Sequence, residues 1–432
     1  MEESRGGSKR TGVLRYAVGE FGLGLTNHAV VAYAIFLYSD TLGLAAGLAG
    51  LARGINAVWD GVNDPLFGWL SDRTRTRLGR RRPWLLATLP LYLTLGVLIW
   101  APPGLLRGDA LFWYFLAALL LYEAASTIAF VNYYALFPVL FRGEQERVHV
   151  NAVRKAIGMV ALAGGVALSP LLFASIGFLG MGLAWAGISA LALAWFLTGL
   201  REPAPGPEPS PGFVAALLQT LRAEGFTAYL TVFALSIFAL ELLMMGIPFY
   251  AKYSLGQDET GTSLLFGAVF LAAIPGAFAW TWIARRLGAR RAWITALVLL
   301  GGALLPLALV RDLVAALLCA ALAGVGVAGT MVLADVILAR IIDQDAARTG
   351  VRREGAFYGV AAALARLSGV LIALSFAALT PLFGYISGEA PGPDPDRAFR
   401  FFVTVLPGVG LGLAALAARA LPGEEVKDAR AT

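Results

Sequence analysis

The sequence predicts an all-α integral membrane protein with twelve transmembrane helices. Of its 432 residues, 58% are hydrophobic, and the mean hydropathy is +0.73. Only 14% of the residues are charged, whereas a soluble protein carries about 25%. Apolar runs that approach the roughly 20 residues needed to cross a bilayer recur along the whole chain. Because a backbone within the bilayer has to satisfy its own hydrogen bonds, these runs are predicted to be helices.

Hydropathy and turn residues divide the chain into twelve predicted spans. They cover residues 14–38, 43–70, 84–102, 110–139, 151–176, 179–199, 226–251, 259–284, 292–310, 312–341, 355–384 and 398–420. The stretch REPAPGPEPSPG at 201–212 between the sixth and seventh spans is rich in proline, which predicts a linker. The stretch FVAALLQTLRAEG that follows is amphipathic and is expected to lie along the inner membrane surface.

This pattern predicts two six-helix halves. The N-terminal half covers 1–200, a cytoplasmic linker with the amphipathic helix covers 201–225, the C-terminal half covers 226–421, and a cytoplasmic tail covers 422–432. Short basic loops, GWLSDRTRTRLGRRRP and WIARRLGARR, follow the second and the eighth span, at equivalent points of the two halves. The organisation resembles the major facilitator fold, in which two six-helix halves are related by a pseudo-two-fold axis along the membrane normal.

The distribution of basic residues predicts the orientation. With the N-terminus inside, the cytoplasmic segments hold about 27 of the 34 Lys and Arg residues, so both termini are expected in the cytoplasm. The net charge of +6 is explained by these flanking residues, and we expect no nucleic acid partner. The chain is expected to be a multi-pass protein of the inner (plasma) membrane, a monomer in contact with membrane lipid.

Ionisable residues inside spans cost roughly 2.5–3.5 kcal/mol each to insert, so each requires an explanation. Those with a charge that lie more than five residues from a span end are Glu20, Arg53, Asp60, Asp64, Glu123, Glu241, Asp335 and Arg366.

Asp60 and Asp64 are four residues apart within WDGVNDP, so they share one helix face, with Asn63 on the same side. Without a cation, the two carboxylates would repel each other and one would take up a proton. The spacing therefore predicts a site for Na⁺ or H⁺, with Asp60 and Asp64 as the metal ligands if the ion is sodium. The alternative is that Asp64 only interacts with the adjacent inner loop, near Arg73.

Two arginines lie more than five residues from the ends of predicted spans. Arg53 is two helical turns before Asp60 on the same face, and it is a candidate partner of Asp60 or of the glutamates. Arg366 in the eleventh span is expected to face the cavity or a carboxylate of the other half. We expect Arg366 to sense the charge of the aspartate pair, and Asp72 and Arg73 to contribute to coupling or gating.

Polar residues also occur in the first span. Asn27 and His28 are candidates for the substrate pocket, because His is the usual proton carrier near neutral pH. A lone His is more often packed or in contact with water, and that alternative stays open.

Several motifs resemble the glycoside–pentoside–hexuronide:cation symporter family, whose familiar member is the melibiose permease. The most specific is WDGVNDPLFGWLSDRTRTRLGRRRPW, and further matches are YAVGEFGLGL, FLYSDTLGL, YYALFPVLF, GEQER, VNAVRKA, PFYAKYSLG and RREGAFYGVAAALAR. The resemblance extends over most of the chain. It implies cation-coupled symport of an organic solute by alternating access, with no cofactor apart from the coupling ion.

The resemblance also implies a set of site residues. The family's cation site corresponds to Asp60, Asn63, Asp64 and Thr127. Its span 5 arginine corresponds to Arg154 and its span 11 lysine to Arg366, where the exchange of Lys for Arg removes a group that could release a proton.

The sugar site of the family is less well matched. Two sugar-gripping carboxylates correspond to Gly24 and Phe130, and a tryptophan corresponds to Tyr134. Losing both carboxylates removes strong hydrogen-bond acceptors for a sugar. The glycoside thus stays the family default, and a lysophospholipid or other amphiphile is the alternative, as in the related sodium-dependent lysophosphatidylcholine carriers.

Other functions fit less well. A proton-coupled exporter of drugs or metabolites could use Glu20, Glu123 or Glu241. The chain has two His and one Cys, which disfavours a metalloenzyme. Close helix packing explains the glycines of GLGL and GVGVAG better than phosphate binding does. We therefore expect a transporter and no enzyme.

Overall fold

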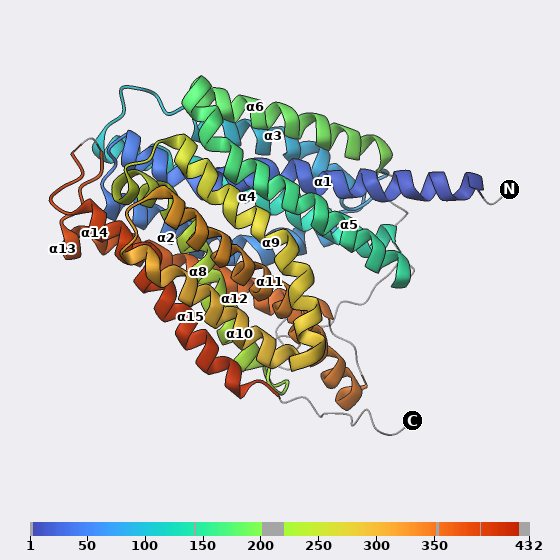
Figure 1. The fold of residues 1–432 in the computed structure, drawn as a ribbon. Coiled ribbons are helices and arrows are strands. Elements are labelled where there is room, and N and C mark those ends of the chain that lie inside the picture. Colours follow the sequence, from blue (N-terminus) through green and yellow to red (C-terminus); the bar gives the residue numbers. More distant parts are fainter. Residues whose placement is uncertain (1–2, 142–143, 201–219, 351–353, 389, 423–432) are drawn as a thin grey trace. The chain divides into compact units, whose positions relative to one another are not determined.

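The computed structural model describes residues 3–141, 144–200, 220–350, 354–388 and 390–422, and long helices account for most of them (Figure 1). Ten segments of this described part are long and apolar enough to cross a membrane. One of the ten, His149–Gly199, contains two of the predicted spans. α2 (Ala46–Arg73) is not among the ten, but its 28 residues exceed the roughly 20 that a crossing requires. All twelve predicted spans are therefore found as helices.

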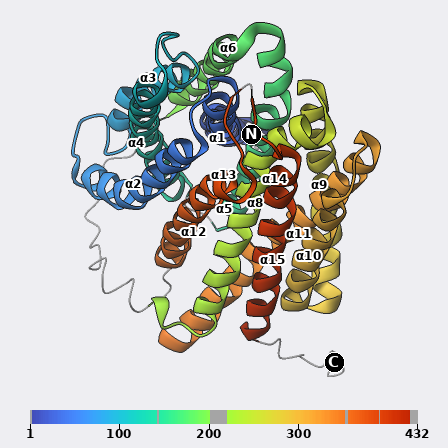
Figure 2. The same ribbon diagram turned by 90° about the vertical axis from the view of Figure 1, so that its left-hand side faces the viewer.

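The chain divides into two compact units, of which the first comprises residues 1–208, 257–263 and 376–395. Its helices are α1 (Glu3–Ile35), α2 (Ala46–Arg73), α3 (Arg82–Ile99), α4 (Gly108–Leu140), α5 (Glu144–Ala163), α6 (Ser169–Gly199) and α13 (Leu379–Phe383). π-Helical turns at Phe36–Thr41 and Gly164–Leu168 extend α1 and join α5 to α6. α1 packs on α5 and α6, and α4 packs on α2 and α3 (Figure 2).

A break at Gly177 separates the fifth and sixth predicted spans. Gly177 has φ 74° and ψ 167° inside an otherwise helical segment. Residues with a Cβ avoid this region, whereas glycine adopts it readily. The predicted boundary between residues 176 and 179 is therefore confirmed, although helical structure continues on both sides of it.

The second unit comprises residues 209–256, 264–375 and 396–432. Its helices are α8 (Phe226–Leu255), α9 (Glu259–Leu287), α10 (Ala289–Leu304), α11 (Leu313–Thr349), α12 (Glu354–Ala377), α14 (Pro395–Arg400) and α15 (Leu406–Ala417). A 3₁₀ turn, Leu305–Ala308, follows α10, a π-helical turn, Phe401–Val405, joins α14 to α15, and a 3₁₀ turn, Ala418–Ala420, follows α15. α10 packs on α11, and α15 packs on α8 and α10. Of the predicted linker and amphipathic helix, residues 201–219 lie outside the described residues.

A reciprocal tyrosine pair fastens α1 to α4 in the first unit. The Tyr16 hydroxyl donates to the carbonyl of Tyr133 at 3.1 Å, and the Tyr133 hydroxyl donates to the carbonyl of Tyr16 at 2.7 Å. Their rings are stacked, with centroids 4.6 Å apart. Because both side chains are buried, these bonds form where water does not compete, and they fix the height of α4 against α1.

Glycines of the GVGVAG motif let α11 approach its neighbours closely in the second unit. A Cβ at Gly326 would lie 2.8 Å from the Cα of Leu300 on α10, and one at Gly329 would lie 2.5 Å from the indole of Trp280 on α9. A side chain would therefore force the helix backbones apart. The prediction that helix packing explains these glycines is confirmed.

Candidate functional site

The contact between α2 and α4 brings Asp60 and Thr127 together. The Thr127 hydroxyl lies 3.5 Å from Asp60 Oδ1. Thr127 is 2% exposed, and Asp60 is half-buried. Oxygen atoms in a good O–H···O hydrogen bond are about 2.7–2.8 Å apart, so this contact is a weak hydrogen bond. A hard cation such as calcium holds its oxygen ligands at about 2.3–2.6 Å, so a small cation can contact both oxygens at this separation.

Asn63 occupies the same face of α2, three residues after Asp60. Its side chain is fully buried, and neither its Nδ2 nor its Oδ1 has a hydrogen-bond partner among the described residues. A buried amide without a partner costs about 1–3 kcal/mol, so a bound ion or water is needed to satisfy it. Asn63, Asp60 and Thr127 thus supply oxygen atoms of the kind that the predicted cation site requires.

The C-terminal end of α2 carries the predicted gating residues. Arg73 is exposed in the last turn of the helix, where a positive charge is favourable at the helix C-terminus. Trp84 on α3 donates to Thr74 at 2.8 Å, and Arg81 donates to Ser71, so these bonds hold the loop after α2. The side chains of Asp64 and Asp72 are outside the described structure, and their roles stay predictions.

An ion pair joins α1 to α5 beside α4. Arg154 Nη1 lies 3.3 Å from Glu20 Oε2, with the side chains 17% and 18% exposed, respectively. The Tyr134 hydroxyl donates to Glu20 Oε1 at 3.0 Å. Arg154 also donates to Asn151 Oδ1 at 2.8 Å, while its buried Nε has no partner among the described residues. The predicted pocket residues Arg154 and Tyr134 are therefore brought together by Glu20.

The sequence did not assign Glu20 to the substrate pocket, although its charge within a span was noted. The sequence contained a signal for this contact, because a glutamate on α1 and an arginine on α5 are charged residues of opposite sign, and such residues usually pair with each other inside a membrane. The guanidinium of Arg154 stacks on the Tyr134 ring, 4.9 Å from its centroid. Phe130 extends this surface, its ring centroid 5.7 Å from that of Tyr134.

The other predicted pocket residues on α1 lie deeper in the first unit. A Cβ at Gly24 would lie 3.2 Å from the Cβ of Ala161 and 3.4 Å from His28 Nε2. Gly24 is buried, and its size lets α1 approach the helix that contains Ala161. The Asn27 Oδ1 accepts a hydrogen bond from the Tyr122 hydroxyl at 3.3 Å. These contacts give Gly24 and Asn27 packing roles, and their part in substrate binding stays a prediction.

Arg366 lies on α12 in the second unit and is half-buried. Asp60 lies in the first unit, so the predicted charge sensing by Arg366 stays a prediction. Among the described residues, no group of three or more His, Cys, Asp or Glu side chains could hold a metal ion. This finding does not include the side chain of Asp64.

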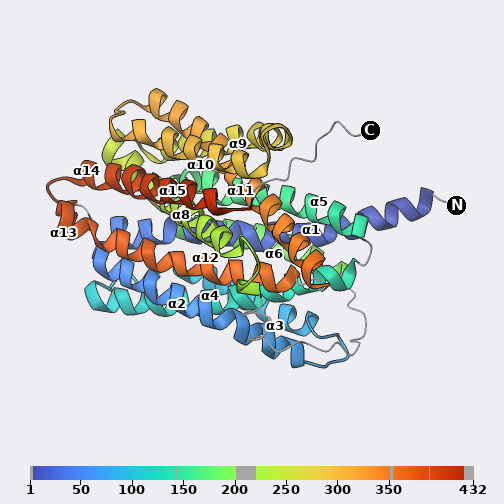
Figure 3. The ribbon, with the colours of Figure 1, turned by 90° about the horizontal axis from the view of Figure 1, so that it is seen from below.

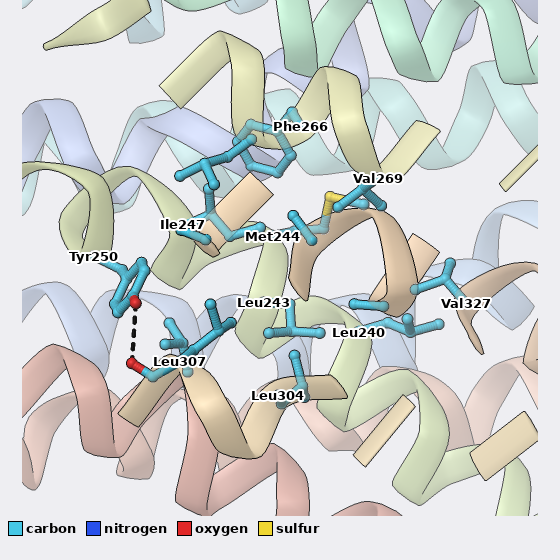
Figure 4. A pocket seen from close by; sticks show the side chains of 15 residues that line it. Leu240, Leu243, Met244, Ile247, Tyr250, Phe266, Val269, Leu304, Leu307 and Val327 are labelled. Carbon is cyan, nitrogen blue, oxygen red and sulfur yellow. Dashed lines mark hydrogen bonds between the residues drawn. The ribbon is translucent and has the colours of Figure 1, made fainter. Parts of the chain in front are cut away.

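The second unit contains an apolar cavity of about 40 Å³ (Figure 4). Its walls come from α8, α9, α11 and the segments after α10 and α14, with Met244, Phe266 and Val327 among the side chains that line it. Tyr250 lies at one end, and its hydroxyl donates to the Leu307 carbonyl at 2.9 Å. A cavity this small and without exposed polar atoms cannot hold a sugar, so we place the solute site elsewhere.

Comparison with known proteins gives a match over nearly the whole chain. Residues 15–422 match the MFS/sugar transport protein family. A structure of the nucleoside transporter NupG (D323A mutant) has a similar fold, with a TM-score of 0.71, 10% identity, and coverage of 95% of this chain and 99% of that one. The predicted fold class is confirmed by this likeness, which at such low identity concerns the fold alone.

The relatives found by sequence are more similar in sequence, but they match only part of the chain. An uncharacterised symporter of Synechocystis is 32% identical over 238 residues, 52% of this chain and 43% of that protein. The putative glycoside/cation symporter YagG of Escherichia coli is 27% identical over 272 residues, 59% of this chain and 57% of that protein. The chain thus spans about half the length of these curated relatives. A sodium-dependent lysophosphatidylcholine symporter of Danio rerio is 28% identical over 156 residues, 36% of this chain and 29% of that protein.

Proposed function

Because the chain belongs to the MFS/sugar transport protein family of the major facilitator superfamily, we propose that this multi-pass membrane transporter couples the movement of an organic solute to that of a cation. The observation that carries the proposal is the contact of Asp60 with Thr127, beside the buried and unpartnered amide of Asn63. Such groups are expensive in a membrane and commonly mark ion pathways. The predicted ligand Asp64 completes the proposed site.

The proposed transport is symport by alternating access, in which solute and cation bind to the same conformation. A cation between α2 and α4 would neutralise charge and fix the distance between these helices. Because α4 also carries Tyr134 and Phe130, cation binding can order one wall of the solute pocket. The solute then binds more tightly to the cation-loaded protein, which is the coupling that linkage requires.

The proposed solute is of the glycoside type. Tyr134 is 42% exposed, and its ring can stack on the apolar face of a sugar. Glu20 accepts two hydrogen bonds, and a carboxylate has about four acceptor positions, so it can accept more from sugar hydroxyls. The unpartnered Nε of Arg154 adds a donor. The similarity to YagG supports this choice.

The alternative solute is a lysophospholipid or another amphiphile. Phe130 makes one side of the pocket apolar, and part of the chain is similar to a sodium-dependent lysophosphatidylcholine symporter. The charges of Arg154 and Glu20 balance each other in their ion pair. A zwitterionic or neutral head group therefore suits the pocket better than an anionic one.

Proton-coupled export is a further alternative, in which Glu20 would carry the proton. Its bonds to Arg154 and Tyr134 hold the carboxyl group in place, which favours a structural role over proton transfer. We also propose the inner membrane as the location, with both termini in the cytoplasm, because basic residues gather in the segments that would then face inward.

A ligand screen by thermal shift tests the proposal. The purified chain is mixed with methyl glycosides, disaccharides or lysophosphatidylcholine, each in sodium chloride and in choline chloride at several pH values. Stabilisation that requires both a solute and the cation is expected, because a ligand that binds only the folded state raises its stability. Stabilisation by a solute at every ionic condition, with no contribution from Na⁺ or pH, would contradict coupling.

A further inference from the structure

Asn56 lies one helical turn before Asp60 on α2 and is not part of the predicted cation site. Its side chain is 0% exposed, and neither Nδ2 nor Oδ1 has a hydrogen-bond partner among the described residues. Asn63 has the same two properties. The spacings from Asn56 to Asp60 and from Asp60 to Asn63 are four and three residues, so the three side chains share one face. Two unsatisfied amides therefore flank Asp60 along α2.

The face of α2 that carries Asp60 lies beside α4, where Asp60 contacts Thr127. α3 returns the chain across the unit, so α2 and α4 run in the same direction (Figure 3). The contact of Asp60 with Thr127 fixes the register of the two helices. One turn earlier on each helix, Asn56 and Glu123 lie at the same level. Glu123 thus places a carboxyl side chain at the level of Asn56.

The pair of amides bears on the identity of the ion. A proton needs one titratable group, and an amide does not itself take up a proton near neutral pH. A metal cation instead takes several oxygen ligands, among them the carbonyl oxygens of Asn. Seven residues of helix span about 10.5 Å, so Asn56 and Asn63 are too far apart to hold one ion together. Their spacing instead fits two successive ion positions, one at each amide, with Asp60 as a ligand in both.

We propose that Asn56 and Asp60 form a second sodium position, one turn toward the N-terminal end of α2 from the position at Asp60 and Asn63. Sodium mainly occupies this position at equilibrium and passes from it to the inner position during transport, and the amide oxygens make the pathway one for a metal cation. The inference rests on the proposed function, because it assumes that Asp60 holds the coupling ion.

The test uses Na⁺ alone as the probe. The unfolding temperature of the purified full chain is measured over a series of NaCl concentrations, with choline chloride keeping the ionic strength constant. The variants are Asn56→Leu and Asp60→Asn, with Asn132→Leu as the matched control. Asn132 is a buried amide on α4 whose Nδ2 donates to the Ile128 carbonyl at 2.8 Å.

Asn56→Leu is expected to be at least as stable as the wild type without Na⁺, because leucine replaces an unsatisfied amide of similar size. Its half-saturating Na⁺ concentration is expected to rise about tenfold, the effect of losing one good ligand. Asp60→Asn is expected to lose the response to Na⁺. Asn132→Leu is expected to be less stable at every Na⁺ concentration, with an unchanged half-saturating concentration.

If Asp60→Asn abolishes the Na⁺ response, either of two results would overturn the second sodium position and leave the proposed cation site standing. One is an unchanged half-saturating Na⁺ concentration in Asn56→Leu. The other is a loss of stability of this variant without Na⁺, which would mean that the amide is satisfied within the protein. A normal Na⁺ response in Asp60→Asn would instead overturn the proposed cation site, and the second position with it. A wild-type chain that responds to pH and not to Na⁺ would overturn the sodium assignment.

Discussion

The hydroxyl of Thr127 on α4 lies 3.5 Å from the carboxylate of Asp60 on α2. This contact joins the two helices that carry the proposed cation site, and a small cation can contact both oxygens at this separation. Thr127→Val keeps the shape of the side chain and removes the oxygen. We expect the half-saturating cation concentration to rise about three- to tenfold, measured by thermal shift against NaCl. Thr127→Ser should restore the wild-type value; failure of Ser to do so would indicate a packing role only.

The ion pair of Glu20 and Arg154 gives a second prediction. Each single variant, Glu20→Gln or Arg154→Gln, leaves one largely buried charge without its partner. We expect each to lower the free energy of unfolding by about 1–3 kcal/mol. The double variant should be more stable than the sum of the two losses implies, which a double-mutant cycle measures. Additive losses would mean that the pair has no coupling energy.

Variants of Tyr134 distinguish the contribution of ring stacking from that of hydrogen bonding in the proposed solute pocket. Tyr134→Phe keeps the ring and loses the bond to Glu20, whereas Tyr134→Leu loses both. For a glycoside we expect Phe to retain most of the affinity and Leu to weaken binding by about tenfold, because ring stacking is lost. Solute titrations at saturating Na⁺ provide the measurement. Equal affinities of the Leu variant and the wild type would place the solute away from α4.

The reciprocal bonds of Tyr16 and Tyr133 should affect stability and leave cation binding unchanged. Tyr133→Phe removes the buried bond to the Tyr16 carbonyl and is expected to cost about 1 kcal/mol. Thermal unfolding with and without Na⁺ should show the same loss in both conditions. A loss that depends on Na⁺ would mean that the α1–α4 contact changes when the cation binds.

Gly326 tests the close approach of α11 to α10. Gly326→Ala places a Cβ 2.8 Å from the Cα of Leu300, so the helix backbones have to separate. We expect a loss of about 2–4 kcal/mol or a failure to fold. Gly302→Ala on α10 is the control, because a Cβ there meets no atom within 4 Å. It should be neutral or slightly stabilising, since alanine favours a helix. Equal stability of the two variants would contradict this packing.

The helices could be predicted from sequence because the thickness of the bilayer sets the length of each apolar run. The break at Gly177 followed from the same rule, since 151–199 is too long for one crossing. The opposite charges of Glu20 and Arg154 were a signal in the sequence, but the contact itself depends on the rotation of α1 and α5 about their axes. The sequence of α1 has only a weak amphipathic pattern and gives little information about that rotation. The spacing of Asn56 from Asp60 was visible in the sequence. Asn56 became a candidate ligand only because the structure shows its side chain buried and without a hydrogen-bond partner among the described residues.

The central claim is that a cation held at Asp60 and Asp64 drives solute movement. The most direct measurement is solute uptake by proteoliposomes with an imposed Na⁺ or proton gradient, using the solute found by thermal shift. Asp60→Asn and Asp64→Asn are compared with Asp109→Asn, which makes the same exchange at an exposed residue in the first turn of α4. We predict that the first two lose gradient-driven uptake and that Asp109→Asn retains it. Uptake that follows the gradient normally in Asp60→Asn and Asp64→Asn would contradict the proposed coupling site.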